Sequence, residues 1–240
     1  MAESTGTGAD ERPRRAMVVV AHPDDAEFLC AGTVAKLCAE GWEVTYVLAT
    51  SGDKGSSDPE MTSAKLAAIR EAEQNAAARV LGVREVVFLR HPDGSVETSV
   101  EFRGEIVELL RTHRPELVIT WESYRRGFNH RDHRAVGIAT YDAVFPAARD
   151  PLYYPEHAAT GLDAFKVPVL LLAGSEQPDY FVDISDYFDT KLEAVYCHTS
   201  QIRPLPKEEF MAQRRRQAVE AGQQSGTPFA EAFRRVTLRV

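Results

Sequence analysis

The residues best suited to chemistry form two short clusters of histidine and aspartate. The first is the run His-Pro-Asp-Asp at residues 22–25, and the second is His-Arg-Asp-His at residues 130–133. An imidazole beside two adjacent carboxylates offers ligands for a metal ion together with a spare base. Histidines three apart at the start of a helix project to one side. These residue types therefore predict a metal site with an acid–base group beside it.

Each cluster follows a segment that is predicted to be a buried strand. Residues 17–20 are wholly apolar and stop just before the first cluster, while residues 117–121 precede the second cluster and its polar loop, 122–129. Ligands in open α/β sheets bind beyond the carboxyl ends of the strands. Both clusters would share one edge of the sheet if these strands are neighbours, as in the 3-2-1-4 strand order of doubly wound sheets.

At that edge, His22 and Asp25 would combine with either His130 or His133. Two histidines and one carboxylate, with a fourth position open, is the arrangement of catalytic zinc. A simpler interpretation is that the first cluster is a turn with an aspartate helix cap and the second a solvated helix start. A cap explains one aspartate and leaves His22 and the second cluster without a role, so the metal site is preferred.

The elements that must position these clusters alternate along the chain. The patterns predict strands at 17–20, 42–50, 85–89, 117–121, 169–173 and 180–184, and helices at 25–40, 61–81, 99–113 and 186–198. This alternation is typical of a three-layer, Rossmann-like α/β fold, a mostly parallel sheet with helices on both faces. Residues 1–15 are predicted to be a disordered N-terminal segment, and 16–240 a single domain. Residues 214–240 are expected to be mostly helical and polar.

The composition limits the classes of molecule that the protein is expected to bind. Hydrophobic residues make up 44% and charged residues 27% of 240 residues, which is ordinary for a globular protein. A formal charge of −8 argues against nucleic acid or an anionic membrane as partner. We expect no membrane span and no signal peptide. Cys30, Cys38 and Cys197 lack zinc-ribbon spacing and are predicted to be buried, reduced thiols of a cytoplasmic protein. The oligomeric state stays open, and a homo-oligomer is compatible with the sequence.

Two other function classes fit the pattern less well. A nucleotide-dependent oxidoreductase would need a glycine-rich turn after the first strand, where this chain has acidic residues. A phospho-receiver module also places an acidic pair after its first strand, but it leaves His22 and the second cluster without a purpose.

With these motifs in view, the sequence resembles the PIG-L/LmbE superfamily of zinc-dependent N-acetylglucosaminyl deacetylases. The resemblance rests on AHPDDAEFLCAGTVAKL at residues 21–37 and the later HRDH, with weaker blocks at residues 70–73, 93–94, 191, 198–201 and 230–233. Arg131 departs from the family, which commonly has proline there.

The resemblance implies a role for each residue of the two clusters. His22, Asp25 and His133 would bind Zn²⁺, Asp24 would be the general base, and His130 would stabilise the oxyanion or act as an acid. Asp132 is expected to orient one of the flanking histidines.

Three further residues would contact the substrate by the same resemblance. They are Arg70, Asp93 and His198, although Arg70 could instead pair with a neighbouring glutamate, Asp93 could form a simple turn and His198 could be structural. The implied activity is hydrolytic removal of an acetyl or short acyl group from the nitrogen of a small amino-sugar substrate. The alternative is a zinc amidase that acts on a non-sugar or thiol-conjugate amide.

Overall fold

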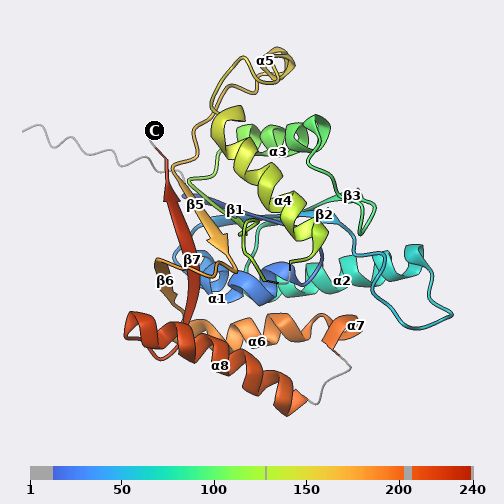
Figure 1. Ribbon diagram of the computed structural model, residues 1–240, viewed down its shortest axis with the longest axis vertical. Helices are drawn as coiled ribbons and strands as arrows, with labels where there is room; N and C mark the ends of the chain where they lie inside the picture. Colours follow the sequence, from blue (N-terminus) through green and yellow to red (C-terminus); the bar gives the residue numbers. More distant parts are fainter. Residues whose placement is uncertain (1–12, 128, 203–206, 239–240) are drawn as a thin grey trace, which may run out of the picture.

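A seven-stranded sheet organises the residues described by the computed structural model, which are 13–127, 129–202 and 207–238 (Figure 1). The strands are β1 (Arg15–Val20), β2 (Glu43–Thr50), β3 (Glu85–His91), β4 (Leu117–Trp121), β5 (Val169–Ala173), β6 (Tyr180–Asp183) and β7 (Ala230–Thr237). Their order is β3-β2-β1-β4-β5-β7-β6, and β7 runs antiparallel to both of its neighbours. The 3-2-1-4 order on which the site prediction depends is therefore confirmed.

Helices cover both faces of this sheet, as predicted. They are α1 (Asp25–Ala39), α2 (Ser63–Leu81), α3 (Val100–His113), α4 (Arg131–Asp142), α5 (Glu156–Ala159), α6 (Phe188–Tyr196), α7 (Thr199–Ile202) and α8 (Lys207–Ser225), with single turns at Ala143–Ala147 and Ser185–Tyr187. Figure 1 shows α3 and α4 on one face and α1 and α2 on the other, where α6 packs against α1 and α2. Within the described ranges, no helix is long and apolar enough to cross a membrane.

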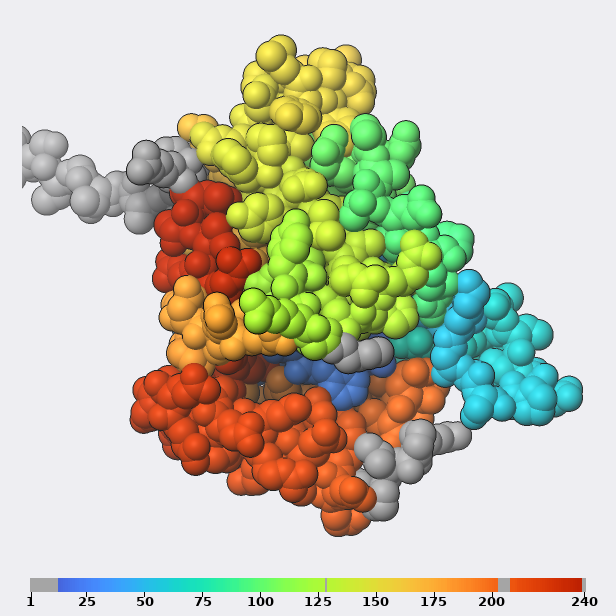
Figure 2. Space-filling view, viewed as in Figure 1, coloured from blue at the N-terminus to red at the C-terminus, as the bar shows by residue number. Residues whose placement is uncertain are grey.

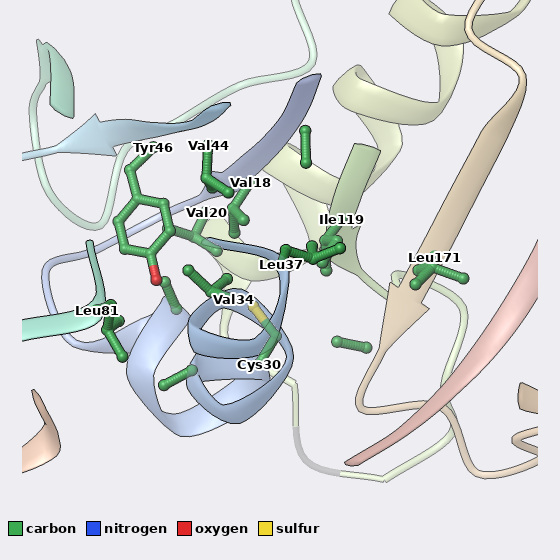
Figure 3. Close-up of a cluster of buried hydrophobic side chains, with 14 of the residues drawn as sticks. Val18, Val20, Cys30, Val34, Leu37, Val44, Tyr46, Leu81, Ile119 and Leu171 are labelled. Atoms are coloured by element: carbon green, nitrogen blue, oxygen red, sulfur yellow. The ribbon is translucent and has the colours of Figure 1, made fainter. Parts of the chain in front are cut away.

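The core explains why β1 is an unbroken apolar run. Val18 and Val20 point to the α1 face, where they meet Val34 (Figure 3). Met17 and Val19 point to the opposite face and pack under α3 and α4. A strand that is buried on both faces has no solvent side on which to place polar residues. β1 then ends just before the histidine–aspartate cluster at residues 22–25.

The prediction of a disordered N-terminal segment is wrong for its last residues. Residues 1–12 of the predicted disordered segment lie outside the described residues. Arg14, within the same segment, forms an ion pair with Glu116 at 3.3 Å, and Arg15 already belongs to β1. Order therefore begins before residue 16, because Arg15 pairs with Glu43 of β2 in the sheet register.

The C-terminal prediction of a mostly helical segment is wrong beyond α8. Residues Ala230–Thr237 form β7, which lies between β5 and β6. A buried Glu231 and two consecutive arginines, Arg234 and Arg235, interrupt the apolar alternation that would have indicated a strand.

Glu231 is buried because its carboxylate binds backbone groups at a break in α1. Cys30 has non-helical backbone angles (φ −148°, ψ 18°), so the helix is interrupted one turn after the first histidine–aspartate cluster. The Glu231 carboxylate accepts the backbone N–H groups of Gly32 and Thr33 beyond the break, at 3.0 and 2.7 Å. Lys191 of α6 pairs with Glu231 at 2.5 Å and donates to the carbonyl of Phe28 at 3.1 Å. One ion pair thus satisfies donors and an acceptor that the broken helix leaves open.

We expect Lys191→Met to lower the free energy of unfolding by about 3–5 kcal/mol, since it leaves a buried carboxylate without its partner. Chemical denaturation checks this value. Lys191→Met/Glu231→Gln should recover part of the loss because it removes the uncompensated charge. Arg14→Met, which breaks an exposed ion pair, is the matched control and should cost at most about 1 kcal/mol. A loss no larger than that of the control would contradict the assigned role.

Candidate metal-dependent active site

The carboxyl ends of β1 and β4 bring the two histidine–aspartate clusters together. β1 and β4 pair directly, and the chain leaves each of them at the same edge of the sheet. The first cluster forms the turn into α1, while His130 caps the N-terminus of α4 and His133 lies in its first turn. The space-filling view shows a hollow on this face between the green-yellow segment and the orange-red C-terminal helices, with blue atoms from early in the chain at its floor (Figure 2).

Donor atoms of His22, Asp25 and His133 converge on one point. His22 Nδ1 lies 3.2 Å from His133 Nε2, and His133 Nε2 lies 3.1 Å from Asp25 Oδ1. The other oxygen of Asp25, Oδ2, lies 3.5 Å from His22 Nδ1. Zinc bonds of about 2.0–2.2 Å in a tetrahedron would separate the donors by about 3.3–3.5 Å. The spacing and chemistry of these donors fit a tetrahedral metal ion.

Two of these three residues, Asp25 and His22, are oriented by contacts on the side away from the converging donors. Asp25 Oδ2 accepts the backbone N–H groups of Ala21 and His22 at 3.1 and 2.9 Å, which leaves Oδ1 toward His133. His22 Nε2 faces two buried carboxylates, Asp93 at 3.1 Å and Asp132 at 3.3 Å. A carboxylate behind a ligand histidine fixes its tautomer, so Nδ1 is the atom that remains for a metal.

Two groups of donors without Asp25 have ligand atoms that all lie within 4.8 Å of one another, namely His22 with His130 and His133, and His22 with Asp93 and Asp132. The second group involves Nε2 of His22, whose N–H donates to the carboxylates of Asp93 and Asp132. In the first group, His130 Nδ1 accepts the backbone N–H of Asp132 at 3.2 Å, which places the proton of the neutral ring on Nε2. A ring in that tautomer is a hydrogen-bond donor, so Asp25 is the better third ligand.

Asp24 lies beside the metal ligands in an unusual backbone conformation. Its φ of 101° is a region that non-glycine residues rarely adopt. Its backbone N–H donates to Gln74 Oε1 at 3.1 Å, and Arg70 donates to its Oδ2 at 3.3 Å. Burial, and then the charge of Asp25, raise the pKa of Asp24 to about 7 against the opposing pull of Arg70. A pKa near neutrality suits a general base.

The charges around His22 and Asp25 are strongly coupled to each other. Burial alone would lower the pKa of His22, but contacts with Asp132, Asp25 and Asp93 outweigh it and raise this pKa to about 12. Burial would raise the pKa of Asp25, yet His133 and His22 hold it well below its usual range. A metal ion binds the neutral imidazole, so an ion at His22 Nδ1 would compete with a proton there.

The residues predicted to contact substrate are all buried among protein partners. Arg70 donates to the carbonyls of Pro23 and Gly52, at 2.6 and 3.1 Å, as well as to Asp24. It therefore supports Asp24 and the loop after β2. Asp93 faces His22 and also accepts the backbone N–H of Lys54 at 3.1 Å, which makes it a partner of a ligand.

His198 departs furthest from its predicted role. Its side chain is fully buried, and its Nε2 lies 3.0 Å from Glu27 Oε2. Glu27 in turn accepts the side-chain N–H of Gln74 at 3.0 Å, and Gln74 holds the backbone of Asp24. His198 thus anchors a buried chain of hydrogen bonds that ends at Asp24, and substrate has no access to it in this arrangement.

Sequence reasoning missed Gln74, Glu27 and Trp121. Gln74 is four residues after Arg70, so both side chains lie on the same face of α2, which is the signal that could have found it. Glu27 lies in the first turn of α1, where an acidic residue is ordinary for a helix N-terminus. Trp121 is the last residue of β4, and the sequence pattern indicates only that it belongs to a strand.

The fold and the site together define a Rossmann-like α/β protein in which two histidines and one carboxylate converge at the carboxyl edge of the sheet, with a second carboxylate beside them. Residues 17–144 match the family model described as PIG-L: GlcNAc-PI de-N-acetylase, and the chain belongs to this family.

Relatives with known names and structures share most of the chain. The diacetylchitobiose deacetylase of Thermococcus kodakarensis is 33% identical over 221 residues, which cover 92% of this chain and 82% of that protein. A probable N-acetyl-alpha-D-glucosaminyl L-malate deacetylase 2 of Bacillus anthracis is 31% identical over 196 residues, covering 78% of this chain and 81% of the relative. The structure of N,N'-diacetylchitobiose deacetylase from Pyrococcus horikoshii, complexed with an inhibitor, superposes with a TM-score of 0.88 at 30% identity and covers 93% of this chain and 84% of that one.

Proposed function

We propose that this chain is a zinc-dependent hydrolase that removes an acetyl or short acyl group from the nitrogen of an N-acylglucosamine-type substrate. The observation that carries the proposal is the convergence of His22, Asp25 and His133 at tetrahedral spacing with the carboxylate of Asp24 beside them. The names of the relatives, which act as deacetylases on acetylated glucosamine compounds, support the same substrate class. The three free cysteines suit a cytoplasmic enzyme.

Zinc would supply Lewis acidity, polarising the amide carbonyl and lowering the pKa of water to about 7. Asp24 accepts the proton of the attacking water and can return it to the leaving nitrogen, since Arg70 and Gln74 hold it at the metal ligands. His130 donates from Nε2 to the oxygen that becomes negative as the carbonyl is attacked. Burial, and then the neighbouring His22 and His133, lower the pKa of His130, so it meets the substrate as a neutral donor.

We expect His130→Ala to lower kcat by about 10²–10³-fold, the usual cost of losing one oxyanion donor, while zinc content stays at the wild-type level. Steady-state kinetics and metal analysis of the same preparation test this. Loss of zinc from His130→Ala, with zinc retained in His133→Ala, would mean that the two histidines have exchanged roles.

Mass spectrometry of a panel of N-acetylglucosaminides tests the substrate class. The expected products are acetate and the free amine, seen as the mass change of one acetyl group replaced by hydrogen. The glycosidic bond should stay intact, because hydrolysis there requires two carboxylates across an anomeric carbon. Glycosidic cleavage, or inertness across the panel despite bound zinc, would contradict the proposal. In the second case, a matched panel of thiol-conjugate and non-sugar amides identifies the alternative substrate.

A further inference from the structure

Trp121, the last residue of β4, contacts two of the proposed metal ligands at once. Its indole N–H donates to Asp25 Oδ2 at 3.3 Å. Its ring stacks on the imidazole of His133, with 3.9 Å between ring centroids and 10° between planes. The side chain is buried, and no part of the mechanism above uses it. Trp121 therefore links a ligand on α1 to a ligand on α4.

β4 and α4 lie close enough together to keep the ring of Trp121 stacked on that of His133. Gly137 lies four residues after His133 on the same face of α4. A Cβ at Gly137 would lie 2.5 Å from the carbonyl oxygen of Trp121 and 2.1 Å from Ser123 Oγ. Only glycine permits this approach without a shift of α4. Ser123 Oγ also donates to the carbonyl of Arg134 at 3.1 Å, which ties the loop after β4 to the same helix.

We propose that Trp121 is a positioning residue that sets the spacing of Asp25 and His133 before the metal binds. The indole N–H joins the two backbone donors on Asp25 Oδ2, so that Oδ1 is the oxygen left facing His133 at 3.1 Å. The stacked ring fixes the plane of His133 and so the direction of its Nε2. Donors ordered in advance lose less entropy when the ion binds, which raises affinity. This inference rests on the proposed metal site.

Zinc affinity, measured by competition with a chromophoric chelator, tests the inference without any substrate. We expect Trp121→Leu, which loses both the N–H and the stack, to weaken binding by about 10–100-fold, the usual effect of removing a support of a metal ligand. Trp121→Phe keeps a ring for stacking and loses only the N–H, so its loss should be smaller. Trp42→Phe is the matched control, because Trp42 packs under Arg14, away from the carboxyl edge of the sheet.

Fluorescence gives an independent measurement, since the chain has 2 tryptophans. In Trp42→Phe, all tryptophan emission comes from Trp121. The emission should change on titration with zinc and saturate at one equivalent, because the imidazole stacked on Trp121 becomes a metal ligand. In Trp121→Phe, the remaining emission of Trp42 should not respond.

The outcomes separate this inference from the proposed function. Failure of the wild-type chain to bind zinc would overturn both. Wild-type affinity in Trp121→Leu, or an unresponsive Trp121 in Trp42→Phe that nevertheless binds zinc, would overturn only the role of Trp121. Circular dichroism of each metal-free variant shows whether it is folded. If Trp121→Leu is not, the more conservative Trp121→Phe and the fluorescence titration decide.

Discussion

Replacing His133 with alanine should release the metal and abolish hydrolysis. The imidazole Nε2 lies 3.2 Å from His22 Nδ1 and 3.1 Å from Asp25 Oδ1, so its loss removes one of three converging donors. His22→Ala and Asp25→Ala should have the same effect. Metal analysis by mass spectrometry, together with product release, gives both quantities for each variant.

Chelation should inactivate the wild-type enzyme, and zinc or cobalt should restore it. The matched control is His113→Ala, at the C-terminal end of α3 and thus at the opposite edge of the sheet, which should keep metal and activity. Full activity in metal-free protein would refute the proposed chemistry, whichever variant showed it.

Asp24→Asn should lower kcat by about 10²–10⁴-fold while metal content remains at the wild-type level. The amide keeps the shape of the side chain and its contact with Arg70, but it cannot accept a proton, and general-base catalysis contributes about this factor. Single-turnover kinetics on zinc-loaded protein measures the chemical step directly.

Asp25→Asn is the natural comparison, because the two aspartates are adjacent, Asp25 being buried and Asp24 half-buried. It should weaken metal retention, since the Asp25 carboxylate is the proposed ligand. Equal zinc loss from Asp24→Asn and Asp25→Asn would show that the roles of base and ligand are wrongly divided. An Asp24→Asn enzyme with wild-type kcat would show that another group accepts the proton.

The parallel half of the fold was predictable because burial on both faces leaves a strong pattern. β1, β2 and β4 are nearly unbroken apolar runs, and each predicted strand matches an observed one. β7 was not predictable in this way, because its buried Glu231 is stabilised by Lys191, a residue 40 positions away. The break in α1 at Cys30 was not predictable from sequence either, because the side chains that stabilise it come from α6 and β7.

The proposed metal ligands and base could be found from sequence because they lie in two compact motifs at strand ends. The residues that support them are scattered, and residue type alone misleads about their role. Arg70 and His198 suggested a polar substrate pocket, yet the side chains of both form hydrogen bonds with other groups inside the protein. Trp121 carries no sequence pattern, since only the pairing of β4 with β1 brings it to Asp25.

The ion pair between Lys191 and Glu231 supports the break in α1 from segments that are made much later, which matters during synthesis on the ribosome. The nascent chain holds every proposed metal ligand once His133 has emerged. The carbonyl of Phe28 must then wait for Lys191, and the N–H groups of Gly32 and Thr33 for Glu231, about a hundred residues after His133. Until then the first turn of α1, with Asp25 in it, is joined to an unsupported helix break. The enzyme should therefore gain its mature metal affinity only after the last strand has docked.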